Sequence, residues 1–202
     1  MSNHSESVPD QSESGDPSAI DVLESDRDLQ SSGVRLNIEI KARCSDHQSI
    51  RDILELRGAR TVGEDHQIDT YFNVEAGRLK LREGNIENSL IFYHRPDSAG
   101  PKRSDVLLYR VAPDPSLKEV LGASLGIKVV VDKRREIFFD ENVKIHLDRV
   151  QGLGAFLEIE AIDADGTRTE EELKKQCDSF MDLFSVQDED LVEKSYSDLL
   201  MS

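Results

Sequence analysis

Polar and apolar residues alternate without interruption from Arg35 to Arg43. Successive side chains of a β-strand point to opposite faces, so this stretch predicts a strand with one apolar face and one polar face. The polar face carries Asn37, Glu39 and Lys41 as well as Arg43. A face of this kind is ordinary on a strand that packs on a core and turns its other side to water. Taken alone, the pattern therefore favours a surface strand.

The same arrangement recurs in four later segments, which weakens that interpretation. The charged residues that share a strand face in these segments are Arg78, Lys80 and Arg82; Lys133 and Arg135; Lys144, His146 and Asp148; and Glu158 and Glu160. Lysines and arginines at every second position, answered by paired carboxylates on other strands, fit a closed barrel with a polar interior. We therefore predict an α+β fold: a closed antiparallel β-barrel of about eight strands with a polar, charged lumen and helices packed outside.

Apolar periodicity and turn residues predict the remaining elements. Besides the strands that begin at Arg35 and Arg78, strands are expected over residues 61–74, 89–95, 102–112, 127–139, 142–150 and 156–162. Helices are expected from Ser45, as N-cap, to Gly58; from Pro115 to Gly126; over 169–184 with Thr169 as N-cap; and over 188–200. These helices would cover the apolar outside of the barrel.

The formal net charge of −16 is concentrated at the two ends of the chain. Residues 1–33 carry −7 and residues 163–202 carry −8, which leaves −1 for the residues between them. Residues 1–33 are also rich in Ser, Asp, Glu and Pro, so we expect a disordered acidic tail followed by one domain over residues 34–202. Overall acidity argues against nucleic-acid binding, which needs a basic surface, but allows an anion to bind in a locally basic lumen.

The two cysteines, Cys44 and Cys177, provide neither a disulfide framework nor metal-ligand spacing. The sequence has no basic segment followed by an apolar run at its start, and no apolar run of about eighteen residues. We therefore expect a cytoplasmic protein with no membrane partner.

Several lysines and arginines around one lumen match the distributed negative charge of a polyphosphate, because each guanidinium can bond two oxygens and each ammonium supplies a point charge. Carboxylates among them would repel that ligand unless a divalent cation lay between. Glu39, Asp148, Glu158 and Glu160 offer the hard oxygen ligands that Mg²⁺ and Mn²⁺ prefer. Both signs of charge together therefore predict a metal-dependent site for a phosphorylated small molecule.

The segment N-I-E-I-K-A-R resembles the E-x-E-x-K signature of the CYTH superfamily of triphosphate tunnel metalloenzymes, which includes class IV adenylate cyclases and thiamine triphosphatases. The other matches, in chain order, are D-T-Y-F, L-K-L-R, R-P at Arg95, P-K-R-S at 101–104, K-R-R-E, I-H-L-D and G-L-G-x-F-L-E-I-E ending at Glu160. The likeness covers most of residues 34–200. The N-I-E-I-K-A-R and S-Y-S-D-L-L segments are most similar to the bacterial group described as class IV adenylate cyclases.

The resemblance implies roles for individual residues. Metal would be held by Glu39, Glu158 and Glu160, with Asp148 helping. Phosphate would be bound by Lys41, Lys80, Arg82, Lys133 and Arg135, with Arg95 and Lys102 as weaker matches. Lys41 and Asp148 are the expected catalytic residues. Asn37 occupies the first acidic position of the signature, which leaves the number of metal ions open.

Two interpretations of His146 stay open: it is a ligand or base, or, beside Asp148, it merely forms a hydrogen bond within the barrel wall. Three functions also remain. The favoured one is that of an adenylate cyclase, which converts ATP into cyclic AMP and pyrophosphate. The alternatives are a triphosphatase that hydrolyses thiamine triphosphate or inorganic tripolyphosphate, and a non-catalytic polyphosphate or nucleotide binder. The oligomeric state is open, with a homodimer among the alternatives.

Overall fold

The computed structural model describes residues 35–202. The strands in this range are β1 (Arg35–Arg43), β2 (Arg60–Phe72), β3 (Arg78–Glu83), β4 (Ser89–His94), β5 (Lys102–Arg110), β6 (Ile127–Asp140), β7 (Val143–Val150) and β8 (Gly154–Asp163). The helices are α2 (His47–Leu56), α3 (Pro115–Leu125), α4 (Glu170–Leu183) and α5 (Tyr196–Leu200), with a 3₁₀ turn η1 (Asp188–Asp190). The predicted tail, residues 1–33, and residue 34 lie outside the described residues.

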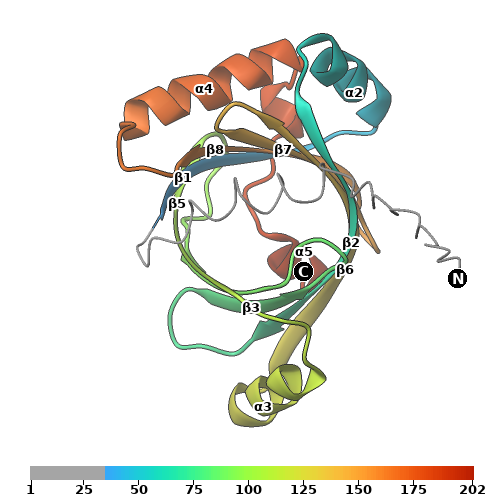
Figure 1. Cartoon of the computed structure of the whole chain (residues 1–202), viewed down its shortest axis with the longest axis vertical. Helices are drawn as coiled ribbons and strands as arrows, with labels where there is room; N and C mark the ends of the chain where they lie inside the picture. Colours follow the sequence, from blue (N-terminus) through green and yellow to red (C-terminus); the bar gives the residue numbers. More distant parts are fainter. Residues whose placement is uncertain (1–34) are drawn as a thin grey trace, which may run out of the picture. The chain divides into compact units, whose positions relative to one another are not determined.

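Within the described residues, the strands form one antiparallel sheet that closes on itself. The order is β1-β5-β4-β3-β2-β6-β7-β8, and β8 pairs again with β1. Figure 1 shows this ring of strands end-on, with α2 and α4 lying against its outside. The predicted α+β architecture, an antiparallel ring of about eight strands with outer helices, is confirmed.

The main apolar core lies between the ring and the helices α2 and α4. Its fully or nearly buried members include Ile38, Ile40, Leu54, Ile145, Leu147, Leu157, Ile159, Leu173, Cys177 and Phe180. Because Ile38 and Ile40 of β1 pack toward the helices, the alternation along the strand turns Glu39 and Lys41 to the opposite side. We call this side, away from α2 and α4, the inner face of the strands.

The helix boundaries follow local capping chemistry. Asp46, and not the predicted Ser45, is the N-cap of α2, because its side chain accepts a hydrogen bond from the backbone N–H of Ser49 at 3.1 Å. Thr169 caps α4 as predicted, and Glu172 completes a reciprocal capping box.

The prediction of a helix over residues 188–200 is wrong in its middle part. Residues 191–195 are not helical, and the backbone groups of Val192 and Glu193 bond to the ring. The N–H of Val192 donates to the carbonyl of Lys41 at 2.8 Å, and Nζ of Lys102 donates to the carbonyls of Val192 and Glu193, each at 3.2 Å. The chain then enters α5, which lies within the outline of the ring in Figure 1.

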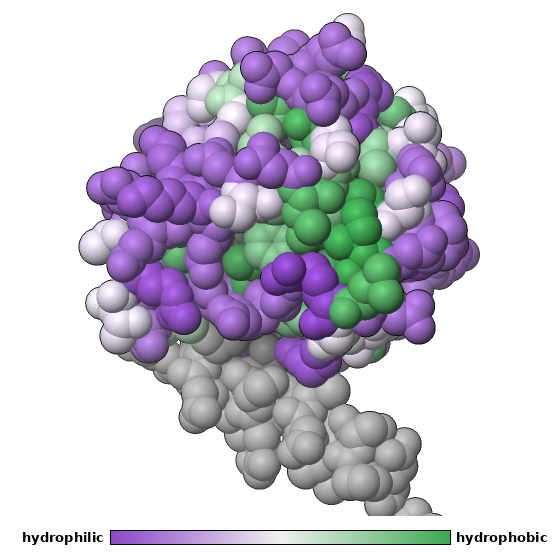
Figure 2. Space-filling view, turned by 90° about the horizontal axis from the view of Figure 1, so that it is seen from above, coloured by the Kyte–Doolittle hydropathy of each residue, from purple (hydrophilic) through white to green (hydrophobic). Residues whose placement is uncertain are grey.

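The surface on the side of α2 and α4 is mainly hydrophilic, with a hydrophobic patch among the polar side chains (Figure 2). None of the helices in the described part of the chain has the length and apolar character needed to cross a membrane.

Candidate functional site

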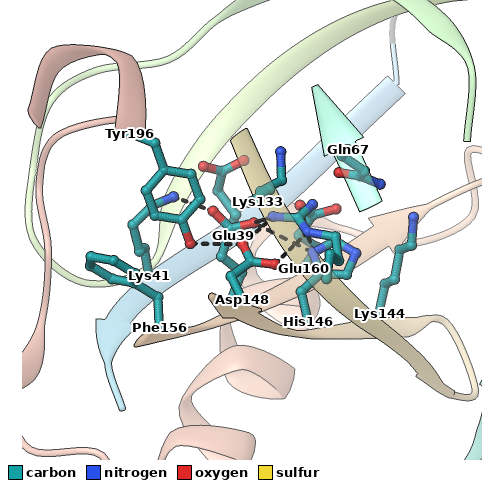
Figure 3. Close-up of polar contacts among 12 residues, drawn as sticks. Glu39, Lys41, Gln67, Lys133, Lys144, His146, Asp148, Phe156, Glu160 and Tyr196 are labelled. Carbon is teal, nitrogen blue, oxygen red and sulfur yellow. Dashed lines mark hydrogen bonds and ion pairs between the residues drawn. The ribbon is translucent and has the colours of Figure 1, made fainter. Parts of the chain in front are cut away.

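Charged side chains of the inner face meet inside the ring. Those that are buried are Lys41, Asp65, Asp69, Arg82, Lys102, Lys133, Arg135, His146, Asp148 and Glu158. Lys144 of β7 donates to Glu87, which lies in the turn between β3 and β4, at 2.5 Å. Because β7 and β4 lie on opposite sides in the strand order, this contact crosses the inside of the ring. Figure 3 shows part of this charged cluster.

Asp69 of β2 is the common partner of three cations. Its carboxylate accepts from Nζ of Lys80 at 2.9 Å, from Nζ of Lys133 at 2.7 Å, and from Nε and Nη2 of Arg82 at 2.8 and 3.0 Å. Burial opposes ionisation, but Arg82, Lys133 and Lys80 hold the pKa of Asp69 well below its usual range. In the sequence, Asp69 was noted only as part of the D-T-Y-F motif, and no role was predicted for it. Its position opposite Arg82 in the β2–β3 register is what brings the two together.

A second group of charges is centred on Glu158 of β8. Its carboxylate accepts from Nζ of Lys41 and from Nη2 of Arg135. Nε of Arg135 also donates to Asp148 at 2.6 Å, and Oη of Tyr196 donates to Asp148 at 2.8 Å. Burial raises the pKa of Glu158, but Lys41 and Arg135 together hold it well below its usual range. Both oxygens of Asp148 thus accept hydrogen bonds from protein groups, and Asp148 and Glu158 together orient Arg135.

Glu160 lies opposite Glu39 in the register of β8 and β1. Among residues 35–202, the carboxylate of Glu160 accepts no hydrogen bond, and its Oε1 lies 3.6 Å from Nδ1 of His146. Burial raises the pKa of Glu160; Lys144 lowers it, whereas Glu158 and Glu39 raise it further. A carboxylate that is costly to ionise and has no fixed donor is the kind of group that a cation would stabilise.

The two weaker matches have different surroundings. Arg95, whose side chain is 3% exposed, donates to Oε1 of Glu39 at 2.5 Å, which brings it into the charged cluster. Lys102 donates to backbone carbonyls, those of Ser98, Val192 and Glu193. Burial, and then the charge of Arg95, lower the pKa of Lys102 to about 8. The contacts of Lys102 therefore fix the C-terminal segment against the ring.

Of the two interpretations left open for His146, the hydrogen bond within the barrel wall is not found among the described residues. The side chain of His146 is 1% exposed, and neither ring nitrogen has a hydrogen-bond partner in the part of the chain that the structure describes. Nδ1 lies 3.4 Å from Oε2 of Glu158. Burial, and next the charge of Arg135, lower the pKa of His146 to about 3, so the ring is neutral near pH 7.

The residues present fit a divalent cation. Candidate ligand atoms of His146, Glu158 and Glu160 all lie within 4.8 Å of one another. The amide oxygen of Asn37 is buried without a hydrogen-bond partner among the described residues, and buried polar atoms in proteins are usually satisfied. Neighbouring carboxylates with an unpaired imidazole nitrogen form a donor set that Mg²⁺ or Mn²⁺ can occupy.

Glu87 belongs to the charged cluster although no strand pattern pointed to it. The carboxylate of Asp65 accepts from the backbone N–H groups of Ile86 and Glu87 at 2.9 and 3.0 Å, which shapes the turn that carries Glu87. A Cβ at Gly84 would come within 2.7 Å of both oxygens of Asp65, so the turn requires glycine there. Periodicity cannot identify a residue that a turn carries to the ring.

The model of the CYTH domain family matches residues 35–196. A protein of Methanocaldococcus jannaschii, named as a "putative adenylate cyclase", is 25% identical over 177 residues, which cover 81% of this chain and 98% of that protein.

Two solved structures have the same fold. A protein from Pyrococcus horikoshii is 28% identical, with a TM-score of 0.67 and coverage of 81% of this chain and 98% of its own. A protein from Hippeastrum, described as a "putative adenylyl cyclase" with a dominant triphosphatase activity, is 17% identical, with a TM-score of 0.54 and coverage of 83% and 94%. At that identity the second likeness concerns the fold alone.

Proposed function

The chain belongs to the CYTH family, and on this basis we propose that it is a divalent-metal-dependent enzyme that acts on a triphosphate, converting ATP into cyclic AMP and pyrophosphate. The observation that carries the proposal is the set of buried lysines and arginines on the inner face, held beside the carboxylates with which they pair and beside Glu160, whose carboxylate makes no hydrogen bond to the described residues. A buried cation is costly unless it is paired, so a fold retains several of them together only with enough negative charge nearby.

The proposed phosphate-binding residues form two sets. Lys80, Arg82 and Lys133 are held by Asp69, while Lys41 and Arg135 are held by Glu158. Their donors are oriented before any ligand binds, so little reorganisation is needed when phosphate oxygens arrive. Arg95, which is tied to Glu39, is a further candidate at the same cluster.

We propose Glu39, Glu158 and Glu160 as the carboxylate ligands of the metal ion. When bound, Mg²⁺ or Mn²⁺ would neutralise phosphate charge and lower the pKa of a coordinated hydroxyl group. Asn37 offers an amide oxygen in place of a carboxylate, so it would lower the negative charge of the site by one relative to the E-x-E-x-K signature. Asp148 is proposed to act through Arg135, which it orients.

In the proposed cyclisation, the ribose 3′-oxygen of ATP attacks the α-phosphorus, and the proton of the 3′-hydroxyl passes to solvent water. The bond from that phosphorus to the bridging oxygen breaks, and pyrophosphate leaves with the electron pair. Lys41 and Arg135 would stabilise the charge that develops on pyrophosphate, because preoriented cations act strongly in a site that excludes water. Lys41 is therefore the proposed catalytic cation.

Triphosphate hydrolysis is the second candidate, favoured by the activity described for the Hippeastrum protein. Water would then attack a terminal phosphorus of thiamine triphosphate or inorganic tripolyphosphate, with the same cations binding the chain of phosphates. A protein that only binds polyphosphate or nucleotides would use these residues as well.

Separate incubations with ATP, thiamine triphosphate and tripolyphosphate, each with Mg²⁺ or Mn²⁺, test these functions by ion-exchange chromatography of the products. Cyclic AMP and pyrophosphate from ATP are expected. Orthophosphate from tripolyphosphate, with no cyclic AMP from ATP, would overturn the cyclase in favour of the hydrolase. If no product forms from any of the three substrates but binding is measurable, the protein is a non-catalytic polyphosphate or nucleotide binder.

A matched pair of variants shows whether the product comes from this site. Lys133→Met removes a buried cation of the cluster, whereas Lys118→Met removes a lysine whose side chain is 34% exposed and pairs with Glu83. Activity should fall in Lys133→Met alone.

A further inference from the structure

We propose that His146 supplies a nitrogen ligand to the divalent cation, beside Glu158 and Glu160. This inference rests on the proposed metal-dependent function and extends it, because the E-x-E-x-K signature and the late E-x-E pair consist of oxygen ligands. The site would then hold its metal with a mixed imidazole and carboxylate donor set.

The geometry around Nδ1 of His146 carries the inference. This atom lies 3.4 Å from Oε2 of Glu158 and 3.6 Å from Oε1 of Glu160. Two ligand atoms that are each about 2.1 Å from a shared metal ion lie about 3.4 Å apart when the angle between them is tetrahedral, and about 3.0 Å apart at a right angle. The distance from Nδ1 to each of the two carboxylate oxygens is therefore close to the spacing that a shared ion requires, and candidate ligand atoms of the three residues lie within 4.8 Å of one another.

The second observation is that neither ring nitrogen of His146 makes a hydrogen bond to the described residues, although Nδ1 lies at ion-pair distance from two carboxylates. His146 is 1% exposed, yet both of its ring nitrogens are without a hydrogen bond among residues 35–202. Buried polar atoms are rarely left in this state, and metal-binding imidazoles use a ring nitrogen that is otherwise unprotonated and free. The hydrogen bond that would give His146 a purely structural role is absent from the described structure, because Asp148 bonds to Arg135 and Tyr196 instead.

The strand register explains why His146 stands beside these carboxylates. His146 of β7 lies opposite Glu158 of β8, and Lys144 lies opposite Glu160. The charged groups that face the ring are the two glutamates together with Arg135 and Lys144. Arg135 donates to Glu158 and Lys144 donates to Glu87, so neither cation makes a hydrogen bond to the Glu160 carboxylate. Nδ1 and the Glu160 carboxylate are left facing each other.

A nitrogen ligand changes which metal the site prefers. Mg²⁺ favours oxygen ligands and retains its water, whereas Mn²⁺, although it also takes oxygen ligands, belongs to the first-row transition metals that bind mixed nitrogen and oxygen sites. The site should therefore bind Mn²⁺ with a lower dissociation constant than Mg²⁺.

Mn²⁺ alone is the probe, used with the full-length protein. Pulsed EPR of the bound ion detects magnetic coupling to a directly bonded ¹⁴N nucleus, and the EPR signal of free Mn²⁺ gives the dissociation constant. We expect ¹⁴N coupling in the wild-type protein and its loss in His146→Gln. Since removal of groups that merely orient a ligand already weakens metal binding roughly 10–100-fold, the dissociation constant of His146→Gln should rise at least about tenfold.

His47→Gln is the matched control, because His47 is another buried histidine but bonds to the carbonyl of Phe156 on the outer side of β8. Its spectrum should equal that of the wild type. If His146→Gln does not fold, wild-type protein labelled with ¹⁵N-histidine replaces it in the experiment. The coupling of the bound Mn²⁺ should then change from that of ¹⁴N to that of ¹⁵N. An unchanged ¹⁴N signal overturns the proposal.

The outcomes separate this inference from the proposed function. Mn²⁺ that binds without nitrogen coupling, or with coupling that persists in His146→Gln, removes His146 from the ligand set but leaves the carboxylate metal site intact. Absence of Mn²⁺ binding to the wild type, both alone and with tripolyphosphate, would overturn the metal-dependent function and this inference with it.

Discussion

Nζ of Lys133 lies 2.7 Å from Oδ2 of Asp69, and each of these side chains is 1% exposed. The same carboxylate also holds Lys80 and Arg82. One buried acid therefore orients three of the proposed phosphate-binding residues. Loss of that acid would leave cations buried without a partner, which is far more costly than loss of a pair at the surface.

Asp69→Asn should lower the free energy of unfolding by about 3–5 kcal/mol, because it breaks a buried ion pair and leaves the partner charges in place. Urea unfolding followed by circular dichroism measures this change. Glu83→Gln is the control: Glu83 is 37% exposed at its side chain and pairs with Lys118, so its loss should cost less than about 1 kcal/mol. Equal effects of the two substitutions would contradict the proposed importance of Asp69.

Triphosphate binding should be accompanied by proton uptake at Lys133. Burial, partly offset by Asp69, lowers the pKa of this lysine to about 7, so it is largely neutral at pH 8. A bound polyanion favours the charged form and raises the pKa, so Lys133 gains up to about one proton on binding, and affinity falls as the pH rises above 7.

Calorimetry with tripolyphosphate at pH 8, without divalent metal and in buffers of different ionisation enthalpy, measures the protons taken up. Uptake should be smaller in Lys133→Met than in the wild type, and unchanged in Lys118→Met. Equal uptake in all three proteins would show that Lys133 stays charged in the free protein.

The two late glutamates should respond differently to removal of their charge. Glu160→Gln should leave stability nearly unchanged, because the carboxylate of Glu160 accepts no hydrogen bond from the described residues and is costly to ionise. Glu158→Gln should destabilise the fold, because Lys41 and Arg135 lose their shared partner. Both should raise the Mn²⁺ concentration needed for half-saturation. Thermal melts and Mn²⁺ titrations check the two effects, and an unchanged titration in both variants would remove these residues from the metal site.

Tyr196→Phe should lower the free energy of unfolding by roughly 1.5–3 kcal/mol, the usual contribution of a hydrogen bond to a charged group. The hydroxyl of Tyr196 donates to the buried Asp148, while its ring would keep its contacts with Lys41 and Phe156. Tyr109→Phe, at a residue that is 71% exposed, should change stability by less than about 0.5 kcal/mol. Urea unfolding of both variants tests the role of α5 in holding the cluster.

The ring could be predicted because apolar and charged residues alternate along its strands, with the apolar residues against the helices and the charged residues on the inner face. In β1, Ile38 and Ile40 are buried against the helices, while Glu39 and Lys41 face the other charged strands. The charged residues on one face also belong to the candidate site, so the same pattern indicated both the fold and most of the proposed ligands.

Contacts made by residues outside the strands, and contacts that depend on strand register, could not be predicted in this way. The sequence from residue 188 to 200 has an apolar pattern compatible with a helix, yet hydrogen bonds to Lys41 and Lys102 keep residues 191–193 extended. Tyr196 and Glu87 reach the cluster from a helix and a turn, so no period-two pattern marks them. Asp69 lies in a strand, but only the register with β3 shows that it is shared among cations.

The alternation in the ring also determines how the chain can change in length during evolution. Insertion of one residue within β1 would turn Glu39 and Lys41 toward α4 and bring Ile38 or Ile40 among the charges, because strand side chains have a period of two. Residues 164–168, between β8 and α4, are under no such restriction. A change of length is therefore tolerated more readily between strands than within them, where an extra residue has to be taken up by a local register shift such as the one between Thr61 and Gly63 in β2.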